Sequence, residues 1–270
     1  MSGILLRRTI AAQRARLLLV WLGLTLWGFL LPVIYATFGK DVEQIIRSGL
    51  FADAMKILGR FTGGDVFSLR GSLALGLVHP IALALIAVFA VGFPATSVAG
   101  ERQRGTLEVL LARPLARRAL YLTLLVATVL FVALSVAAVL CGMVAGAVLY
   151  GVAADLRAAD LLAAWANDVV LFGAIGALAL AASVTFDRLG PALGLALGFV
   201  ITSYALDIVA RLWPDASWIG RYSVFHYFAP TEILAGRADP ADVALLGAVF
   251  VVAVGYALWV FPRRDLAAPS

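Results

Sequence analysis

Long apolar runs dominate the hydrophobic pattern of this chain. A membrane-spanning helix needs about 20 consecutive, predominantly apolar residues. Runs of this length predict spans over residues 17–38, 77–99, 119–150, 161–186, 189–210 and 243–261. The pattern therefore predicts an all-α, polytopic membrane protein with six transmembrane helices, in which residues 1–270 form a single transmembrane domain.

The third run is longer than a bilayer requires. No charged residue and no proline interrupts residues 119–154. A helix rises by about 1.5 Å per residue, so this run would form a helix about 54 Å long. Because the hydrocarbon core is only about 30 Å thick, we expect one long helix that extends beyond it.

The composition excludes a soluble domain and a disordered chain. Apolar residues make up 63% of the sequence and charged residues 14%, whereas a soluble domain has about 45–50% and about 25%. A single soluble core of this size cannot bury so much apolar surface. Disordered chains are poor in aliphatic residues and rich in charge. The bilayer is the only solvent that suits this chain.

The distribution of arginine predicts the orientation of the spans. Lys and Arg are enriched in cytoplasmic loops of membrane proteins. Here arginines cluster before the first span, between the second and third spans, and after the last span. We therefore expect a plasma-membrane protein whose N- and C-termini are both cytoplasmic. The net charge of +5 then reflects topology and not nucleic-acid binding.

Segments outside the spans also carry recognisable patterns. Residues 1–16 alternate apolar and basic positions at near-helical spacing, which predicts an amphipathic helix on the inner surface. Residues 38–70 mix apolar and charged positions, as in a surface helix on the outer side. Residues 211–242 are rich in aromatic side chains, which suits a re-entrant segment or an aromatic belt at the outer interface. An ordinary interfacial loop is the alternative. The aromatic residues are Trp218, Tyr222, Phe225, Tyr227 and Phe228.

The sequence contains no recognisable catalytic motif. A phosphate-binding loop requires a Gly-Lys pair, and Gly39–Lys40 is followed by Asp41 on the outer side. His79 and His226 are expected to act as capping or interface residues and not as bases. We therefore expect no enzyme, no catalytic residue, and no metal or cofactor site in this chain.

The loop between the second and third spans, residues 101–117, has an unusual pattern. We expect a short helix from Glu101 to Leu111, with leucines on one side. Its other side would present Glu101, Arg104 and Glu108 at positions i, i+3 and i+7. An ordinary basic cytoplasmic loop is the alternative, but such a loop needs neither glutamates nor an amphipathic helix.

This segment resembles the signature of the ABC type-2 permease family, roughly E-x-x-x-G-T-L-E-x-L-L-x-x-P-x-x-R. The residues that match the signature are Glu101, Gly105, Thr106, Leu107, Glu108, Leu110, Leu111, Pro114 and Arg117. In that family the segment forms a cytoplasmic coupling helix that docks onto a separate ATP-binding subunit. The resemblance extends over the whole chain, from the basic N-terminal helix to the aromatic segment before the last span. Family members often carry a lysine about two turns after the Pro-x-x-Arg, and residues 121–126 contain none.

The resemblance implies a transmembrane domain of the ABC type-2 exporter (type V) kind. Such a half-transporter dimerises with a second copy or a paralogue and recruits an ATP-binding cassette ATPase, in which ATP and Mg²⁺ bind. A hydrophobic or amphiphilic substrate would be exported. The alternative is an ATP-independent secondary transporter or channel, which would need polar or ionisable residues deep in several spans.

Glycines in the fifth span suggest a helix interface. Gly190, Gly194 and Gly198 recur four residues apart and therefore share one face. Small residues at this spacing let helices approach closely in lipid. The family resemblance also places the fifth span near a two-fold axis, so we expect this face to contact another helix.

The ionisable residues within the fourth and fifth spans are Asp168, which follows the polar Asn167, and Asp207. Buried carboxylates are costly and often functional. Both aspartates lie near the ends of their apolar runs, so we expect interfacial carboxylates. Asp207 is expected to pair with Arg211 at i+4.

Overall fold

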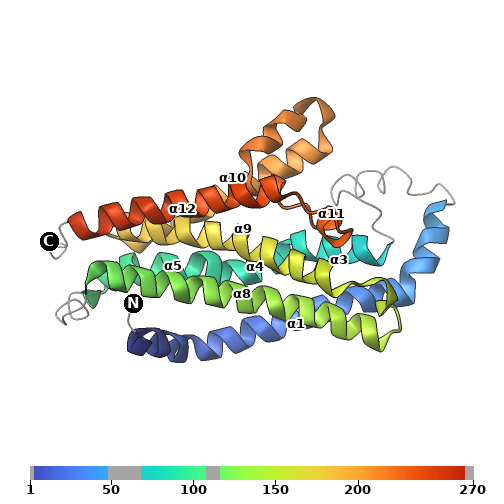
Figure 1. Cartoon of the computed structure of the whole chain (residues 1–270), viewed down its shortest axis with the longest axis horizontal. Coiled ribbons are helices and arrows are strands. Elements are labelled where there is room, and N and C mark those ends of the chain that lie inside the picture. The colour runs from blue at the N-terminus through green and yellow to red at the C-terminus, as the bar shows by residue number, and fades with distance from the viewer. Residues whose placement is uncertain (1–2, 48–67, 108–115, 265–270) are drawn as a thin grey trace.

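The computed structural model describes residues 3–47, 68–107 and 116–264, which form helices and no strands (Figure 1). Six helices in this described part are long and apolar enough to cross a membrane. They are α1 (Gly3–Arg47, its apolar part ending at Phe38), the second-span helix Pro80–Gln103, α8 (Arg117–Leu149), α9 (Ala158–Thr185), α10 (Leu189–Leu212) and α12 (Pro240–Arg263). The predicted all-α fold with six spans is confirmed.

The first helix differs from its prediction. Residues 1–16 were expected to form a separate amphipathic helix, but α1 runs from Gly3 to Arg47 without interruption. Residues 4–16 contain neither glycine nor proline and are rich in Ala, Leu and Arg, which are strong helix formers. The basic segment is therefore a continuation of the first span.

The second-span helix begins later than predicted and is irregular. A short helix, α3 (Leu69–Val78), ends at His79, and Pro80 starts the span as α4 (Pro80–Ala87). Two π-helical segments, η1 (Val88–Gly92) and η2 (Thr96–Gly100), flank α5 (Phe93–Ala95) before α6 (Glu101–Gln103). Pro94 lacks the N–H that would bond to the carbonyl four residues earlier, which is a common cause of such irregularity.

The long third span is confirmed as one helix of 33 residues, α8. Figure 1 shows it running along nearly the whole bundle, with α9 between it and α12. The two termini lie at the same end of the bundle, together with α6 and the start of α8. The basic segments of the sequence therefore gather at one end of the molecule.

The closest helix crossing in the described bundle joins α1 and α8. An ideal Cβ added at Gly142 would lie 2.1 Å from the Thr25 carbonyl oxygen. One added at Gly28 would lie 2.1 Å from the Val139 carbonyl oxygen. Because only glycine has no Cβ, these residues permit backbone contact between the two helices. Gly146 extends the same contact toward Phe29.

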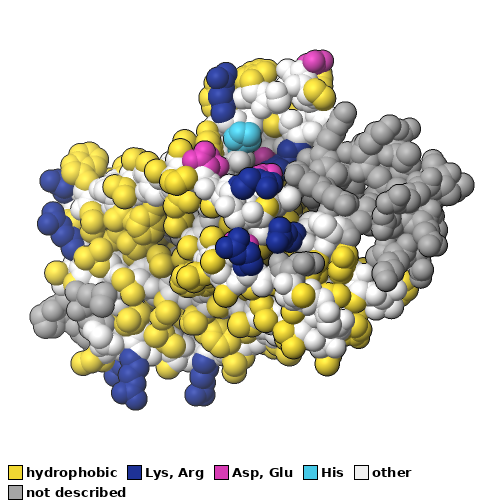
Figure 2. Space-filling view, turned by 45° about the vertical axis from the view of Figure 1, so that its right-hand side comes forward, with side chains coloured by type: hydrophobic (Ala, Val, Ile, Leu, Met, Phe, Trp, Pro, Cys, Tyr) yellow, Lys and Arg dark blue, Asp and Glu magenta, His cyan; other side chains and the backbone are white. Residues whose placement is uncertain are grey.

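The outward surface of the bundle is apolar. Exposed side chains on α1, α10 and α12 include Leu22, Ile201 and Val252. Figure 2 shows hydrophobic side chains over much of one face, with Lys and Arg at its edges and in a cluster near the middle. Such a surface suits contact with lipid chains.

At the other end of the bundle the chain folds back along α10. Helix η4 (Pro214–Tyr222) forms a projecting hairpin with the end of α10 in Figure 1. Then η5 (Val224–Tyr227) and α11 (Pro230–Leu234) return to the bundle before α12. The Ser223 hydroxyl donates to the Ser203 carbonyl oxygen at 2.6 Å and fixes this return. A short helix, η3 (Ala153–Asp155), lies between α8 and α9.

Candidate functional site

The second-span helix ends in a glycine cap at residues 101–106. Gly105 adopts φ +71°, a left-handed conformation that favours glycine. The Gly105 N–H donates to the Arg102 carbonyl oxygen at 2.9 Å, and the Thr106 N–H donates to that of Glu101 at 3.0 Å. These bonds satisfy carbonyl groups that a helix end otherwise leaves unpaired. Gly105 thus reverses the chain at this point.

The Glu101 side chain stabilises the same turn. Its carboxylate accepts hydrogen bonds from the Arg104 guanidinium and from the Thr106 hydroxyl. The hydroxyl also lies 3.1 Å from the Glu101 carbonyl oxygen. The spacing E-x-x-x-G-T therefore has a local physical explanation, since glycine permits the turn and the threonine returns to the glutamate.

This geometry corrects the helix expected from Glu101 to Leu111. Glu101 and Arg104 lie on the end of the second-span helix, and the chain turns at Gly105. Leu107, which is 2% exposed, is again helical. The interior Gly105 stops the helix because its left-handed φ is incompatible with continuation. The other expected coupling residues, Glu108, Leu110, Leu111 and Pro114, lie outside the described residues.

Arg102 and Gln103 attach this helix end to the loop between α9 and α10. The Arg102 guanidinium lies 2.6 Å from the Asp187 carboxylate. The Leu189 N–H, at the start of α10, donates to the Gln103 side-chain oxygen at 2.9 Å. The second span is therefore joined directly to the N-terminus of the fifth.

The C-terminal end of α12 joins the same group. Arg264 also pairs with Asp187, and it donates to the Val184 carbonyl oxygen at 2.9 Å. We refer to Arg102, Asp187 and Arg264 as the Asp187 cluster. Sequence reasoning missed Asp187, because nothing along the chain indicates that two arginines from distant helices converge on it.

Arg117 attaches the C-terminal side of the 101–117 segment to the end of α12. Its guanidinium donates to the Arg264 carbonyl oxygen at 2.6 Å and to that of Pro262 at 3.4 Å. Cations near a helix C-terminus are favoured, because carbonyl groups there lack partners. The 101–117 segment therefore begins at the Asp187 cluster and ends on the last turn of α12.

Asp168 is buried inside the helix bundle, which the sequence did not indicate, and its expected place at the membrane interface stays a prediction. Asp168 is 0% exposed and Asn167 is 3% exposed. Helix α9 begins at Ala158, so Asp168 lies nearly three turns inside it, at about 3.6 residues per turn. Moreover, α9 packs between α8 and α12, which covers its sides. Neither Asp168 oxygen has a hydrogen-bond partner among the described residues, and neither has the Asn167 side-chain oxygen.

Asp207 forms the predicted pair. The Arg211 guanidinium lies 2.7 Å from the Asp207 carboxylate, and this i, i+4 contact is confirmed. Asp207 itself is buried, at 6% exposed. The described part of the chain contains no group of three or more His, Cys, Asp or Glu side chains able to hold a metal ion.

The fifth-span glycines lie on an open face. An ideal Cβ added at Gly190, Gly194 or Gly198 would meet no atom within 4 Å. No helix of the described chain packs closely against them, and a contact with a second subunit stays a prediction. Within the described chain, glycines instead make close contact at the α1–α8 crossing. The spacing of those glycines also arises by chance, so the sequence did not predict this contact.

His79 has the capping role expected of it. Its Nδ1 accepts from the Ile81 N–H at 3.3 Å, and its ring stacks on Trp27 at 4.6 Å between centroids. Burial lowers the pKa of the imidazole, which favours the neutral form that can accept this bond. His226 packs beside Gly220 in the aromatic segment.

The comparison with known families agrees with this architecture. A family model described as "ABC-2 family transporter protein" matches residues 11–266 of the chain. The match includes the turn at residues 101–106, the Asp187 cluster and the helices that carry them. Among curated proteins, none shows significant sequence similarity to this chain.

Proposed function

This chain belongs to the ABC-2 transporter family, and on that premise we propose that it is the permease subunit of an exporter driven by a separate ATPase. Membership confirms the resemblance found in the sequence, and the six apolar helices make the chain a membrane protein. The ATPase would dock on the 101–117 segment, which would lie in the cytoplasm together with both termini. ATP and Mg²⁺ would bind in that partner, since this sequence has no phosphate-binding loop.

The observation that best supports the proposal is the double attachment of the 101–117 segment. On one side, Arg102 and Gln103 contact the α9–α10 loop. On the other side, Arg117 contacts the end of α12. A displacement of this segment by a docked ATPase would therefore be transmitted to α10 and α12 through charged and hydrogen-bonded contacts.

The apolar surface of the bundle and the family membership support a proposal for the subunit assembly and for the kind of substrate. We propose that two copies, or this chain and a paralogue, form the transporter in the plasma membrane. The open glycine face of α10 would then contact the second subunit, because small residues allow close approach in lipid. The exported substrate would be hydrophobic or amphiphilic, which suits a pathway between apolar helices.

An ATP-independent secondary transporter is the second candidate. It is favoured by one observation, the buried carboxyl group of Asp168 without a partner among the described residues. Ionisable groups at such positions often belong to ion pathways. Transport by this chain alone in liposomes, driven by an ion gradient and without nucleotide, would support this candidate.

Replacing Glu108 with Lys tests the docking proposal. A positive charge at this position would oppose a basic groove in the ATPase, and close like charges cost several kcal/mol. We expect normal insertion and dimerisation, with loss of ATPase binding or of transport-stimulated turnover. Copurification of the two subunits measures ATPase binding, and transport in liposomes measures the turnover.

Glu232→Lys is the matched control, because it makes the same charge change in α11 at the opposite end of the bundle. It should leave ATPase binding unchanged. If Glu108→Lys binds the ATPase and transports at the wild-type rate, docking does not depend on this side chain. If it fails to insert, Glu108 has a structural role instead.

A further inference from the structure

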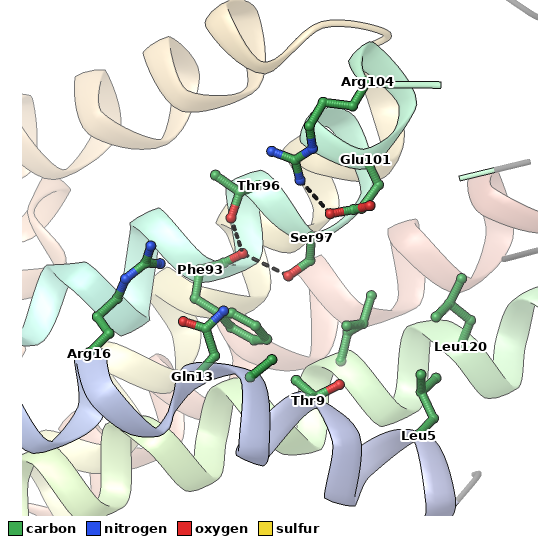
Figure 3. Close-up of a pocket in the computed structure, with 12 residues that line it drawn as sticks. Leu5, Thr9, Gln13, Arg16, Phe93, Thr96, Ser97, Glu101, Arg104 and Leu120 are labelled. Atoms are coloured by element: carbon green, nitrogen blue, oxygen red, sulfur yellow. Dashed lines mark hydrogen bonds and ion pairs between the residues drawn. The ribbon is translucent and has the colours of Figure 1, made fainter. Parts of the chain in front are cut away.

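A cavity of about 320 Å³ lies between α1, the second-span helix and α8, close to the turn at residues 101–106. Figure 3 shows its two polar walls facing each other, one from α1 and one from the second-span helix. None of the roles proposed above uses this cavity. Its lining combines one row of polar groups with apolar side chains, which is the composition of a site for an amphiphile.

The wall from α1 presents three polar side chains, Thr9, Gln13 and Arg16. Their spacing of i, i+4 and i+7 places them on one face of the helix. In the described part of the chain, these side chains make no hydrogen bond or ion pair, although they face the second-span helix (Figure 3). Arg16 directly precedes the apolar stretch that begins at Leu17, the level at which arginines contact lipid headgroups.

The opposite wall leaves the charge of Arg16 uncompensated. The Thr96 and Ser97 hydroxyls donate to the Phe93 carbonyl oxygen at 2.9 Å and 2.7 Å. They therefore present polar oxygens without charge. Glu101, the one acidic residue among the described lining residues, is already paired with Arg104. Among the described side chains that line it, the cavity thus has one cationic group available for an anion, Arg16.

The remaining lining is apolar. Leu5 comes from α1, Phe93 from the second-span helix, and Leu120 and Leu124 from α8. A small hydrated anion gains nothing from these side chains, whereas a molecule with a hydrocarbon part buries apolar surface against them. The lining therefore favours an anion attached to an apolar chain.

We propose that this cavity binds the headgroup phosphate of a phospholipid from the adjacent leaflet. The phosphate pairs with the Arg16 guanidinium and accepts from the Gln13 amide, which are donors of suitable type, while the Thr9 hydroxyl, two turns away on α1, is left to contact the rest of the headgroup. The first acyl carbons contact Phe93, which lies beside Arg16 and Gln13 in Figure 3, whereas Leu5 and Leu120 line the other end of the cavity. The lipid thereby joins α1 to the second-span helix beside the turn at residues 101–106. This proposal does not require an ATPase to dock.

The test uses the full-length protein in detergent, with the lipid that remains bound measured by native mass spectrometry. The probes are dioleoyl phosphatidylglycerol, dioleoylglycerol, which lacks the phosphate, and glycerol 3-phosphate, which lacks the chains. We expect wild type to retain phosphatidylglycerol in preference to both other probes. Loss of a charge-assisted hydrogen bond corresponds to about tenfold weaker binding, so Arg16→Gln should bind phosphatidylglycerol about tenfold more weakly.

Two control variants separate this site from general surface charge. Arg14→Gln removes the same charge from an exposed neighbour that does not line the cavity, and it should bind as wild type. Arg16→Lys keeps the charge and should retain most of the binding. Ser97→Trp fills the cavity without changing charge and should lose binding. Thermal unfolding of each variant verifies that the fold is intact.

Three results would overturn the proposal. Equal retention of dioleoylglycerol and phosphatidylglycerol would make the cavity an apolar groove without headgroup recognition. Displacement of phosphatidylglycerol by millimolar glycerol 3-phosphate would make it a site for a soluble phosphate compound. Equal losses in Arg14→Gln and Arg16→Gln would attribute binding to the general positive charge of α1.

Discussion

Gly105 is the residue on which the turn at residues 101–106 depends. Its φ of +71° is strained for any residue with a Cβ, at a cost of about 1–2 kcal/mol. We expect Gly105→Val to distort the turn and redirect the segment that follows. ATPase binding and coupled transport should fall, while the helices of the bundle remain intact, as measured by copurification and thermal unfolding.

Gly151 provides a matched control for this substitution. It has φ +69° and lies between α8 and η3, at the opposite end of the bundle. Gly151→Val should carry a similar backbone cost without loss of ATPase binding. If both variants lose binding equally, the effect of Gly105→Val comes from general destabilisation.

Asp168 and Asp207 are both buried, but they differ in their partners. Asp207 is paired with Arg211, whereas neither oxygen of Asp168 has a partner among the described residues. An isolated buried charge is very costly, so a neutral amide should replace Asp168 easily. We expect Asp168→Asn to fold and transport normally, and Asp168→Lys to fail to fold, as measured by monodisperse yield.

The same substitution at Asp207 should have the opposite effect. Asp207→Asn would leave Arg211 largely buried without its counter-charge, and breaking a buried pair costs about 3–5 kcal/mol. Its thermal stability should therefore fall well below that of Asp168→Asn. A folded Asp168→Asn variant that no longer transports would instead give the carboxyl group a role in ion coupling.

At the scale of elements, the α1–α8 crossing is the most sensitive contact. A side chain at Gly142 would meet the Thr25 carbonyl oxygen at 2.1 Å from its Cβ, and the two backbones would have to separate. Overpacking typically costs about 1–3 kcal/mol. We expect Gly142→Leu to reduce folded yield and thermal stability strongly.

Gly194→Leu makes the same substitution at a glycine of another membrane-spanning helix and serves as the comparison for Gly142→Leu. Gly194 lies on an open face of α10, where an added Cβ meets no atom of the chain within 4 Å. Folding of the single subunit should be normal, and assembly with a second subunit should be impaired if this face is the interface. Normal dimer yield and transport in Gly194→Leu would remove the fifth-span glycines from the proposed interface.

At the scale of the whole molecule, the Asp187 cluster connects three distant segments. Arg102 ends the second span, Asp187 joins α9 to α10, and Arg264 follows α12. Because Asp187 is about half exposed, at 51%, each ion pair contributes only about 0–1 kcal/mol to stability. The cluster therefore contributes little to folding, and we expect its main effect to be on the coupling of motion between these segments.

Asp187→Asn should separate these two effects. We expect a small change in thermal stability, retained ATPase binding, and a lower ratio of substrate transported to ATP hydrolysed. Glu232→Gln breaks another exposed ion pair, with Arg237 in the segment before α12, and should leave that ratio unchanged. An unchanged ratio in Asp187→Asn would show that the cluster has no part in coupling.

The sequence by itself determined the properties that depend on one helix or one short segment. Span number, the all-α class and the clustering of arginines follow from hydrophobic length and local charge, which are independent of neighbouring helices. The Asp207–Arg211 pair and the capping role of His79 were also predictable, since partners two to four residues apart are brought together by local geometry. The signature at residues 101–117 identified the family for the same reason.

Only the tertiary structure decided which helix faces meet. Asp168 lies near the end of its apolar run, yet it is buried because α8 and α12 cover α9. Gly142 and Gly194 have similar surroundings in sequence, but only Gly142 contacts another backbone. Asp187 acquires its role from arginines 85 and 77 residues away in the chain. Such contacts depend on the way in which the long helices pack against one another. Packing between segments that are distant in the chain leaves no periodic signal along the sequence.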